Sequence, residues 1–244
     1  MKIIADMHCH TVSSTHAYST VEEMVRAASE KNFYAIAITD HGKAMPGAPG
    51  PWYFENLKVI PEKLYGVRVV KGIEANIIDY DGKLDLTETV IESVEWIVAS
   101  MHEITIEPID DIDACTNAWL NIAKNPLVNV IGHSGVEVFK FDYEKVIPEF
   151  GRNGKLVEIN NSSFKVRESA IDNCKTIAKI CKKKRVPIIL NSDAHFSTQV
   201  GIVDDVIRLL NEIDFPEELI VNANIERFKN YFDESLKIRN KYLL

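Results

Sequence analysis

Hydrophobic residues are distributed along this chain in two distinct patterns. Short, continuous hydrophobic runs recur from one end to the other, and between them lie longer stretches in which hydrophobic residues return every three or four positions. The short runs predict buried strands and the longer stretches predict amphipathic helices, a succession typical of βα units around a parallel sheet. Seven strands are predicted, at residues 2–8, 34–41, 67–78, 96–102, 128–134, 155–162 and 186–195.

Helical periodicity fills the intervals between these strands. It covers residues 20–31, 54–65, 87–94, 110–124, 142–151 and 167–184, and it resumes from about residue 201. Thr20 followed by Glu23 forms a capping-box pattern, which predicts that the first helix begins there. The lysine-rich segment 182–185 ends a predicted helix, where cations interact favourably with the helix dipole, and we interpret it as structural.

A segment rich in proline and glycine, residues 42–56, interrupts this succession directly after the second predicted strand. We interpret it as a long loop over one end of a barrel. Its aromatic residues are interpreted as packing residues, with a role as a lid as the alternative: Trp52, Tyr53 and Phe54.

The length and composition predict one barrel-sized domain over residues 1–244, since 46% hydrophobic and 26% charged residues are typical of a soluble globular protein. The net charge of -8 disfavours nucleic-acid binding, which needs clustered Lys and Arg, but permits a local pocket for a small phosphorylated ligand. The four cysteines form no CxxC pair, which predicts reduced thiols in a cytoplasmic protein. Neither an export signal nor a membrane span is expected. The sequence is compatible with either a monomer or a homo-oligomer.

The histidines carry the strongest chemical signal. All seven lie at, or just past, the carboxyl end of a predicted strand, which is where parallel barrels assemble their active sites. One histidine at such a position is more often a hydrogen-bonded core or surface residue. Seven at one end, together with Glu74 and Asp193, predict a metal centre instead. The histidines are His8, His10, His16, His41, His102, His133 and His195.

Strand alternation refines this prediction, because residues two positions apart share a face. His8 and His10 should point the same way, as should Asp193 and His195. Cys9 should point to the other side and is assigned to packing. Asp40 and His41 should face opposite ways unless the strand has already ended, so only one of them is expected to be a ligand.

Several of these stretches together identify a family resemblance. The chain resembles the PHP (polymerase and histidinol phosphatase) superfamily, in particular its stand-alone YcdX-type phosphatases. The resemblance implies an α/β fold, a distorted TIM-like (β/α)7 barrel, with three divalent metal ions, zinc in first place and manganese or iron as alternatives. The matching stretches are "DMHCHTVSSTHAYST", "AITDHG", "GIEANI", "ASMHE", "VIGHSG", "VEINNSSF" and "NSDAH", in family order from residue 6 to residue 195.

The resemblance also implies how the ligands are shared. By position, the ligands of one ion are His8, His10, Glu74 and Asp193. Glu74 would bridge to a second ion held by His102 and His133, and a third ion would be held by His16, His41 and His195. Ser134 replaces the proline expected after the fifth-strand histidine, and Gly50 stands where a polar residue or histidine is expected. Both departures bear on substrate preference more than on metal binding.

The leading functional prediction is hydrolysis of a small phosphomonoester by a metal-activated water. Asp193 and His195 are the candidate catalytic residues for moving the proton. The candidate substrate-binding cations are Lys43, Lys165 and Arg167.

Three alternatives stay open at this point. Histidinol phosphatase is the competing substrate assignment within the family. An amidohydrolase-type enzyme would also begin with HxH, but it usually bridges its metals with a carboxylated lysine, whereas here Glu74 takes that place and Lys71 lies earlier on the strand. The third alternative is a non-catalytic metal-binding module, because this fold also occurs attached to DNA polymerases.

Overall fold

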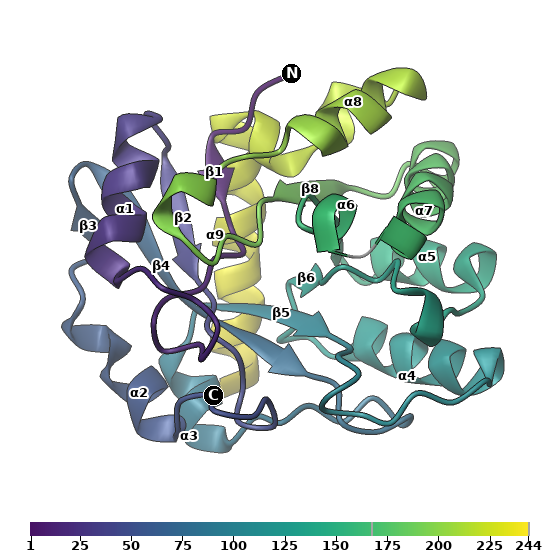
Figure 1. Cartoon of the computed structure of the whole chain (residues 1–244), viewed down its shortest axis with the longest axis horizontal. Coiled ribbons are helices and arrows are strands. Elements are labelled where there is room, and N and C mark those ends of the chain that lie inside the picture. Colours follow the sequence, from purple (N-terminus) through teal and green to yellow (C-terminus); the bar gives the residue numbers. More distant parts are fainter. Residues whose placement is uncertain (167, 244) are drawn as a thin grey trace.

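The computed structural model describes residues 1–166 and 168–243. Within them, seven strands pair in parallel in the order β1-β2-β4-β5-β6-β7-β8, with helices around them (Figure 1). An isolated parallel bridge between Cys9 and Ala194 links the segments that follow β1 and β8, so the sheet nearly closes. The predicted distorted (β/α)7 TIM-like barrel is confirmed. The strands are β1 (Ala5–Asp6), β2 (Ala35–Ile38), β4 (Val67–Asn76), β5 (Trp96–Ser100), β6 (Val130–Ile131), β7 (Leu156–Asn160) and β8 (Ile188–Asn191).

Apart from α2 and α6, the helices follow the predicted intervals, and side-chain caps fix where several of them begin. The predicted capping box between Thr20 and Glu23 is present at the start of α1, and Asp111 and Asp142 cap α4 and α5. The helices are α1 (Val21–Glu30), α2 (Pro51–Glu55), α3 (Glu88–Ser93), α4 (Ile112–Lys124), α5 (Tyr143–Arg152), α6 (Ser163–Val166), α7 (Ile171–Lys184), α8 (Asp204–Glu212) and α9 (Ile225–Leu243). None of these helices combines the length and hydrophobicity that a bilayer crossing requires.

The predicted helix at 54–65 is wrong in its second half. The loop after β2 is shorter than expected because α2 already begins at Pro51, a residue that suits the first turn of a helix. A 3-10 turn follows at Asn56–Val59, and then β3 (Lys63–Leu64) pairs antiparallel with the start of β4. Tyr65 and Gly66, with φ of 52° and 81°, form the two-residue hairpin turn that the helical pattern concealed.

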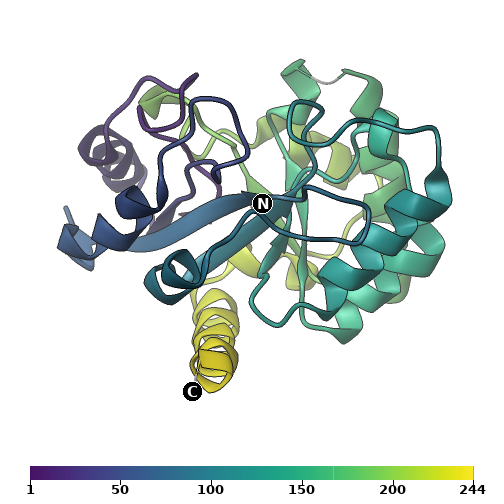
Figure 2. The ribbon, with the colours of Figure 1, turned by 90° about the horizontal axis from the view of Figure 1, so that it is seen from below.

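Two apolar layers surround the strands. The outer layer packs the helices against the sheet, and the inner layer fills one end of the barrel with residues such as Ala37, Val70 and Trp96. Phe228 and Phe232 of α9 belong to this inner layer, so α9 covers the end at which the strands begin. In Figure 2, α9 lies on the side of the sheet opposite the loop that follows β1. The apolar filling thus leaves the carboxyl end of the barrel to polar side chains.

The cysteines and the aromatic residues of the segment after β2 differ in burial. All four cysteines are buried thiols with no disulfide among them, as expected, and Cys9 lies in the outer apolar layer. Phe54 is buried, whereas Trp52 is 85% exposed. The hydroxyl of Tyr53 donates to Oδ2 of Asp40 at 2.5 Å. The predicted packing role therefore holds for Phe54 and for Tyr53, whose ring packs against the core, but not for the exposed Trp52.

Candidate metal centre

Glu74 lies at the centre of the predicted cluster. It is on the inner face of β4, directly above the apolar layer, and only 1% exposed. Its two carboxylate oxygens face five imidazole nitrogens. These are Nε2 of His8 at 3.3 Å, Nε2 of His10 at 3.4 Å, Nδ1 of His41 at 2.7 Å, Nε2 of His102 at 3.4 Å and Nε2 of His133 at 3.0 Å.

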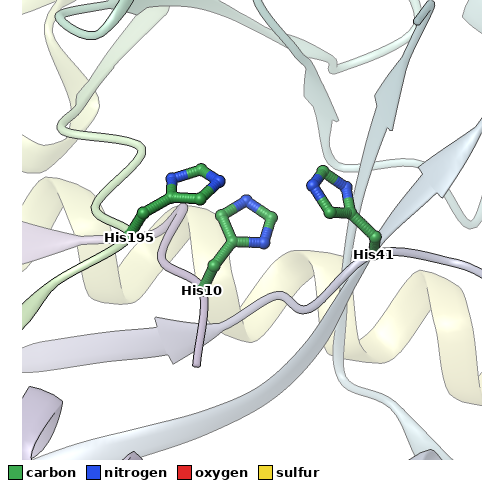
Figure 3. Close-up of side chains that lie close together, drawn as sticks. All are labelled: His10, His41 and His195. Atoms are coloured by element: carbon green, nitrogen blue, oxygen red, sulfur yellow. The ribbon is translucent and has the colours of Figure 1, made fainter. Parts of the chain in front are cut away.

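The candidate ligands gather into three overlapping groups whose ligand atoms lie within 4.8 Å of one another: His8, His10 and Asp193; His41, Glu74 and His102; and His10, His41 and His195. Figure 3 shows the last group, with the ring of His10 between those of His41 and His195. Nε2 of His16 lies 2.8 Å from Nε2 of His195, so this residue also reaches the cluster. All nine predicted ligands therefore converge at one end of the barrel.

The backbone that carries Asp193 and His195 differs from the predicted strand. β8 ends at Asn191, and Asp193 has a left-handed φ of 56°. Asp6 holds the segment in place, because its carboxylate accepts hydrogen bonds from Ser192 and from the backbone N–H of Gly201. Strand alternation is therefore not the reason that Asp193 and His195 face the same centre.

Polar partners behind the cluster fix which nitrogen three of the rings present. Nδ1 of His8 donates to Glu158 at 2.8 Å, and Nδ1 of His195 lies 2.9 Å from the carbonyl of Asp193. Nδ1 of His102 lies 2.8 Å from Oδ1 of Asn76, whose amide nitrogen donates to Asp85. Because each Nδ1 is engaged in this way, Nε2 is left to bind a metal.

His10 is held by a similar arrangement. Its Nδ1 lies 3.2 Å from Oγ of Ser14, which donates to Oδ1 of Asp40 at 2.7 Å. Asp40 also accepts hydrogen bonds from the backbone N–H and the hydroxyl of Thr11. Asp40 is thus a positioning residue, and His41 is the one of the two that faces the cluster, although β2 has already ended at Ile38.

Glu158 is the residue that the sequence reasoning missed. It is 2% exposed on the inner face of β7, where it accepts hydrogen bonds from four groups. Oε1 accepts from His8 and from Nδ2 of Asn191 at 2.8 Å, and Oε2 accepts from the backbone N–H of His133 at 2.8 Å and Nδ2 of Asn160 at 3.1 Å. A glutamate on the inner face of a buried strand, two residues after Leu156, was the available signal.

The electrostatics of the cluster favour ionised carboxylates. Burial acts to raise the pKa of Glu74, but the charges of His8 and His102 outweigh it and hold that pKa well below its usual value. The pKa of Asp193 is also held well below its usual value, because His8 and His10 outweigh the effect of burial. Burial with His41 nearby lowers the pKa of His10, so His10 favours the neutral form that binds metals.

The donor set fits divalent cations. Among the described residues, several buried ligand atoms lie near other polar atoms but make no hydrogen bond of acceptable geometry: Nε2 of His8, Nε2 of His10, Nε2 of His41 and Oε2 of Glu74. A buried polar atom without a partner is costly, and buried carboxylates require positive charge nearby. Imidazole and carboxylate ligands suit zinc, manganese and iron.

The structure describes two of the three predicted substrate-binding cations, and one of these two lines a cavity beside the cluster. Lys165 is exposed and lines a cavity beside Asp193 and His195. Lys43 is exposed, two residues beyond His41. Arg167 lies outside the described residues. Ser134 is buried and Gly50 precedes α2 with open space around it.

A parallel barrel with ionised carboxylates and clustered imidazoles at the carboxyl ends of its strands has the architecture of a metal-dependent hydrolase. The chain belongs to the PHP domain family, whose model matches residues 6–193. It is 48% identical over 242 residues to a probable phosphatase of Acetivibrio thermocellus, an alignment that covers 99% of this chain and 100% of the relative. A probable phosphatase of Thermoanaerobacter sp. is 44% identical over 235 residues, 96% of each chain.

A solved structure has the same fold. The crystal structure of histidinol phosphate phosphatase from Lactococcus lactis, complexed with zinc, L-histidinol and phosphate, matches with a TM-score of 0.63 at 17% identity. The match covers 88% of this chain and 95% of that protein. The family match and the named relatives confirm the prediction of a metal-dependent phosphatase.

Proposed function

We propose that the chain hydrolyses a small phosphomonoester at a trinuclear site, with zinc as the first metal and manganese or iron as alternatives. The ligand atoms form overlapping groups that share His10 and His41, and this close spacing supports several neighbouring ions. His8, His10 and Asp193 would hold the first ion, with Glu74 bridging to a second ion that His102 and His133 hold. His16, His41 and His195 would hold the third.

The arrangement of five imidazoles around one carboxylate carries this proposal. Distances of 2.7 to 3.4 Å between Glu74 and the five rings bring the ligands of neighbouring ions to a single carboxylate. A carboxylate has two oxygens and can bridge two cations, whereas an imidazole nitrogen binds one. An amidohydrolase would need a lysine in this position; Lys71 is three residues earlier on β4, on the opposite face from Glu74.

The protein groups around the cluster have separate tasks in hydrolysis. When bound, divalent cations would neutralise phosphate oxygens and acidify water at neutral pH. Asp193 and His195 lie beside the open cavity, where each could accept or donate the proton that moves between water and the leaving group. Lys165 at the cavity wall, with Lys43 and Arg167 as further candidates, would attract the anionic substrate.

Metal analysis combined with a screen of phosphomonoesters tests the proposal. The purified protein should bind divalent metal and release phosphate from p-nitrophenyl phosphate and other small phosphomonoesters. His102→Ala should lose metal and most activity, because it removes a ligand that lies 3.4 Å from Glu74. Full activity in His102→Ala would contradict the trinuclear arrangement. A protein that binds metal and hydrolyses no ester under any metal loading would favour a non-catalytic binding module.

A further inference from the structure

A cavity of about 370 Å³ lies directly beside Asp193, His16 and His195. This volume is within the range of small-molecule sites, roughly 300 to 1,000 Å³, and exceeds the space that one phosphate group needs. The cavity therefore has room for the organic part of a phosphate ester. The chemistry of its walls indicates which organic group would fit.

Asn161 contributes one hydrogen-bond donor to these walls. Its side chain is buried, with 2% exposure, and its Oδ1 accepts from the backbone N–H groups of Asp205 and Val206 at 3.1 and 3.3 Å. These bonds fix the orientation of the carboxamide at the start of α8. Its amide nitrogen donates to no group in the part of the chain that the structure describes, so it is available to a ligand.

Gln199 repeats this arrangement on another wall. Its Oε1 accepts from the backbone N–H groups of His195 at 2.8 Å and Phe196 at 3.2 Å. The oxygen of this carboxamide is therefore also occupied, and its NH₂ group remains as a donor at the cavity wall.

The remaining polar groups shift the balance further toward donors and positive charge. Lys165 adds an ammonium group and Ser162 adds a hydroxyl. Asp193 is the one carboxylate among the described lining residues, and its oxygens already face His8 and His10 at 3.7 and 3.3 Å and Nδ2 of Asn160 at 3.2 Å. A ligand group in this cavity would meet several donors and little acceptor capacity.

We propose that this cavity holds the leaving group of the phosphomonoester and selects one that carries a second anion, either a carboxylate or another phosphate. The proposal rests on the phosphatase function proposed above. An anion accepts hydrogen bonds from Asn161, Gln199 and Lys165 together, and such charge-assisted bonds are the strong ones. A leaving group with an ammonium, such as that of histidinol phosphate, would leave those donors unsatisfied and would be repelled by Lys165.

Paired substrates of similar size test this selectivity. Phosphoglycolate carries a carboxylate and O-phosphoethanolamine carries an ammonium, and the metal-loaded protein should show kcat/KM at least about tenfold higher for phosphoglycolate. Fructose 1,6-bisphosphate should likewise exceed fructose 6-phosphate, beyond the statistical advantage of its two ester groups. The two pairs separate a site for a carboxylate from a site for a second phosphate.

Reversing the charge of Lys165 tests whether this cavity causes the preference for an anionic leaving group. Lys165→Glu should reduce the ratio of kcat/KM between phosphoglycolate and O-phosphoethanolamine by about tenfold to a hundredfold. Lys237→Ala is the control, because Lys237 is an exposed lysine on α9, which covers the opposite end of the barrel. In this variant the ratio of kcat/KM between phosphoglycolate and O-phosphoethanolamine should equal that of the wild type.

The outcomes separate this proposal from the phosphatase function. Suppose that p-nitrophenyl phosphate is hydrolysed, but phosphoglycolate shows no advantage over O-phosphoethanolamine and fructose 1,6-bisphosphate none over fructose 6-phosphate. This result would overturn the selectivity and leave the phosphatase intact. An unchanged ratio in Lys165→Glu would overturn the role of this cavity. Hydrolysis of no phosphomonoester at all would overturn both proposals.

Discussion

Replacing Glu158 with glutamine tests how strongly the buried shell behind the ligands controls metal binding. The carboxylate accepts four hydrogen bonds, two on each oxygen, at 2.8 to 3.1 Å. A glutamine keeps the size of the side chain but presents one oxygen and one NH₂ group. Two of the four hydrogen-bond donors around residue 158 would then face this NH₂ group, which is itself a donor.

The magnitude follows from these bonds. Hydrogen bonds to a charged group contribute about 1.5 to 3 kcal/mol each, so losing two should reduce the free energy of unfolding by roughly 3 kcal/mol or more. If the NH₂ group faces His8, Nδ1 of His8 must become an acceptor and Nε2 then carries the proton, which blocks metal binding. Loss of such a carboxylate partner typically costs about 10- to 100-fold in metal affinity.

Urea unfolding of the metal-depleted protein and competition with a zinc chelator measure the two effects separately. Glu234→Gln, which removes the charge of an exposed glutamate paired with Lys237, is the control and should change neither quantity. Wild-type zinc affinity and stability in Glu158→Gln would refute the reasoning that this carboxylate positions His8.

Three further predictions concern stability. Tyr53→Phe should destabilise the protein by about 1 to 3 kcal/mol in urea unfolding because it removes the hydrogen bond to Asp40, whereas Trp52→Ala next to it should change stability by less than about 0.5 kcal/mol; equal effects would contradict this. Phe228→Ala should cost about 3 to 5 kcal/mol because its ring fills the inner end of the barrel, and a melting temperature within a degree or so of the wild type would contradict that packing. Burial lowers the pKa of Lys155 to about 8, so between about pH 8 and pH 10.4 the unfolded chain binds more protons at this site and stability should rise with pH. The difference in unfolding free energy between wild type and Lys155→Met should therefore increase over that range, and a flat or falling difference would show that Lys155 is not buried as described.

The ligand cluster was predictable because it depends on strand ends. In a parallel barrel the carboxyl ends of all strands meet, so residues as distant in sequence as His8 and Asp193 were expected together, and they lie 3.7 Å apart. The family resemblance added the division of these ligands among three ions, which stays a proposal.

Other features depended on backbone details that periodicity does not encode. The hairpin at Tyr65 and Gly66 requires positive φ at two residues, and the hydrophobic spacing there resembles that of a helix. The placement of Asp193 depends on its left-handed φ and on Asp6, which is 187 residues earlier in the chain. The roles of Glu158 and Asp40 depend on hydrogen bonds whose donors and acceptors cannot be matched to one another from a single sequence.

The most direct test of the central claim is a metal titration followed by activity in the same samples. The protein is stripped with a chelator, dialysed, and reloaded with zinc or manganese, while bound metal per chain and hydrolysis of p-nitrophenyl phosphate are both measured. The account predicts that activity disappears on stripping and returns with metal, reaching its maximum as the three proposed ions bind. Full phosphatase activity in protein that holds less than one ion per chain would contradict it.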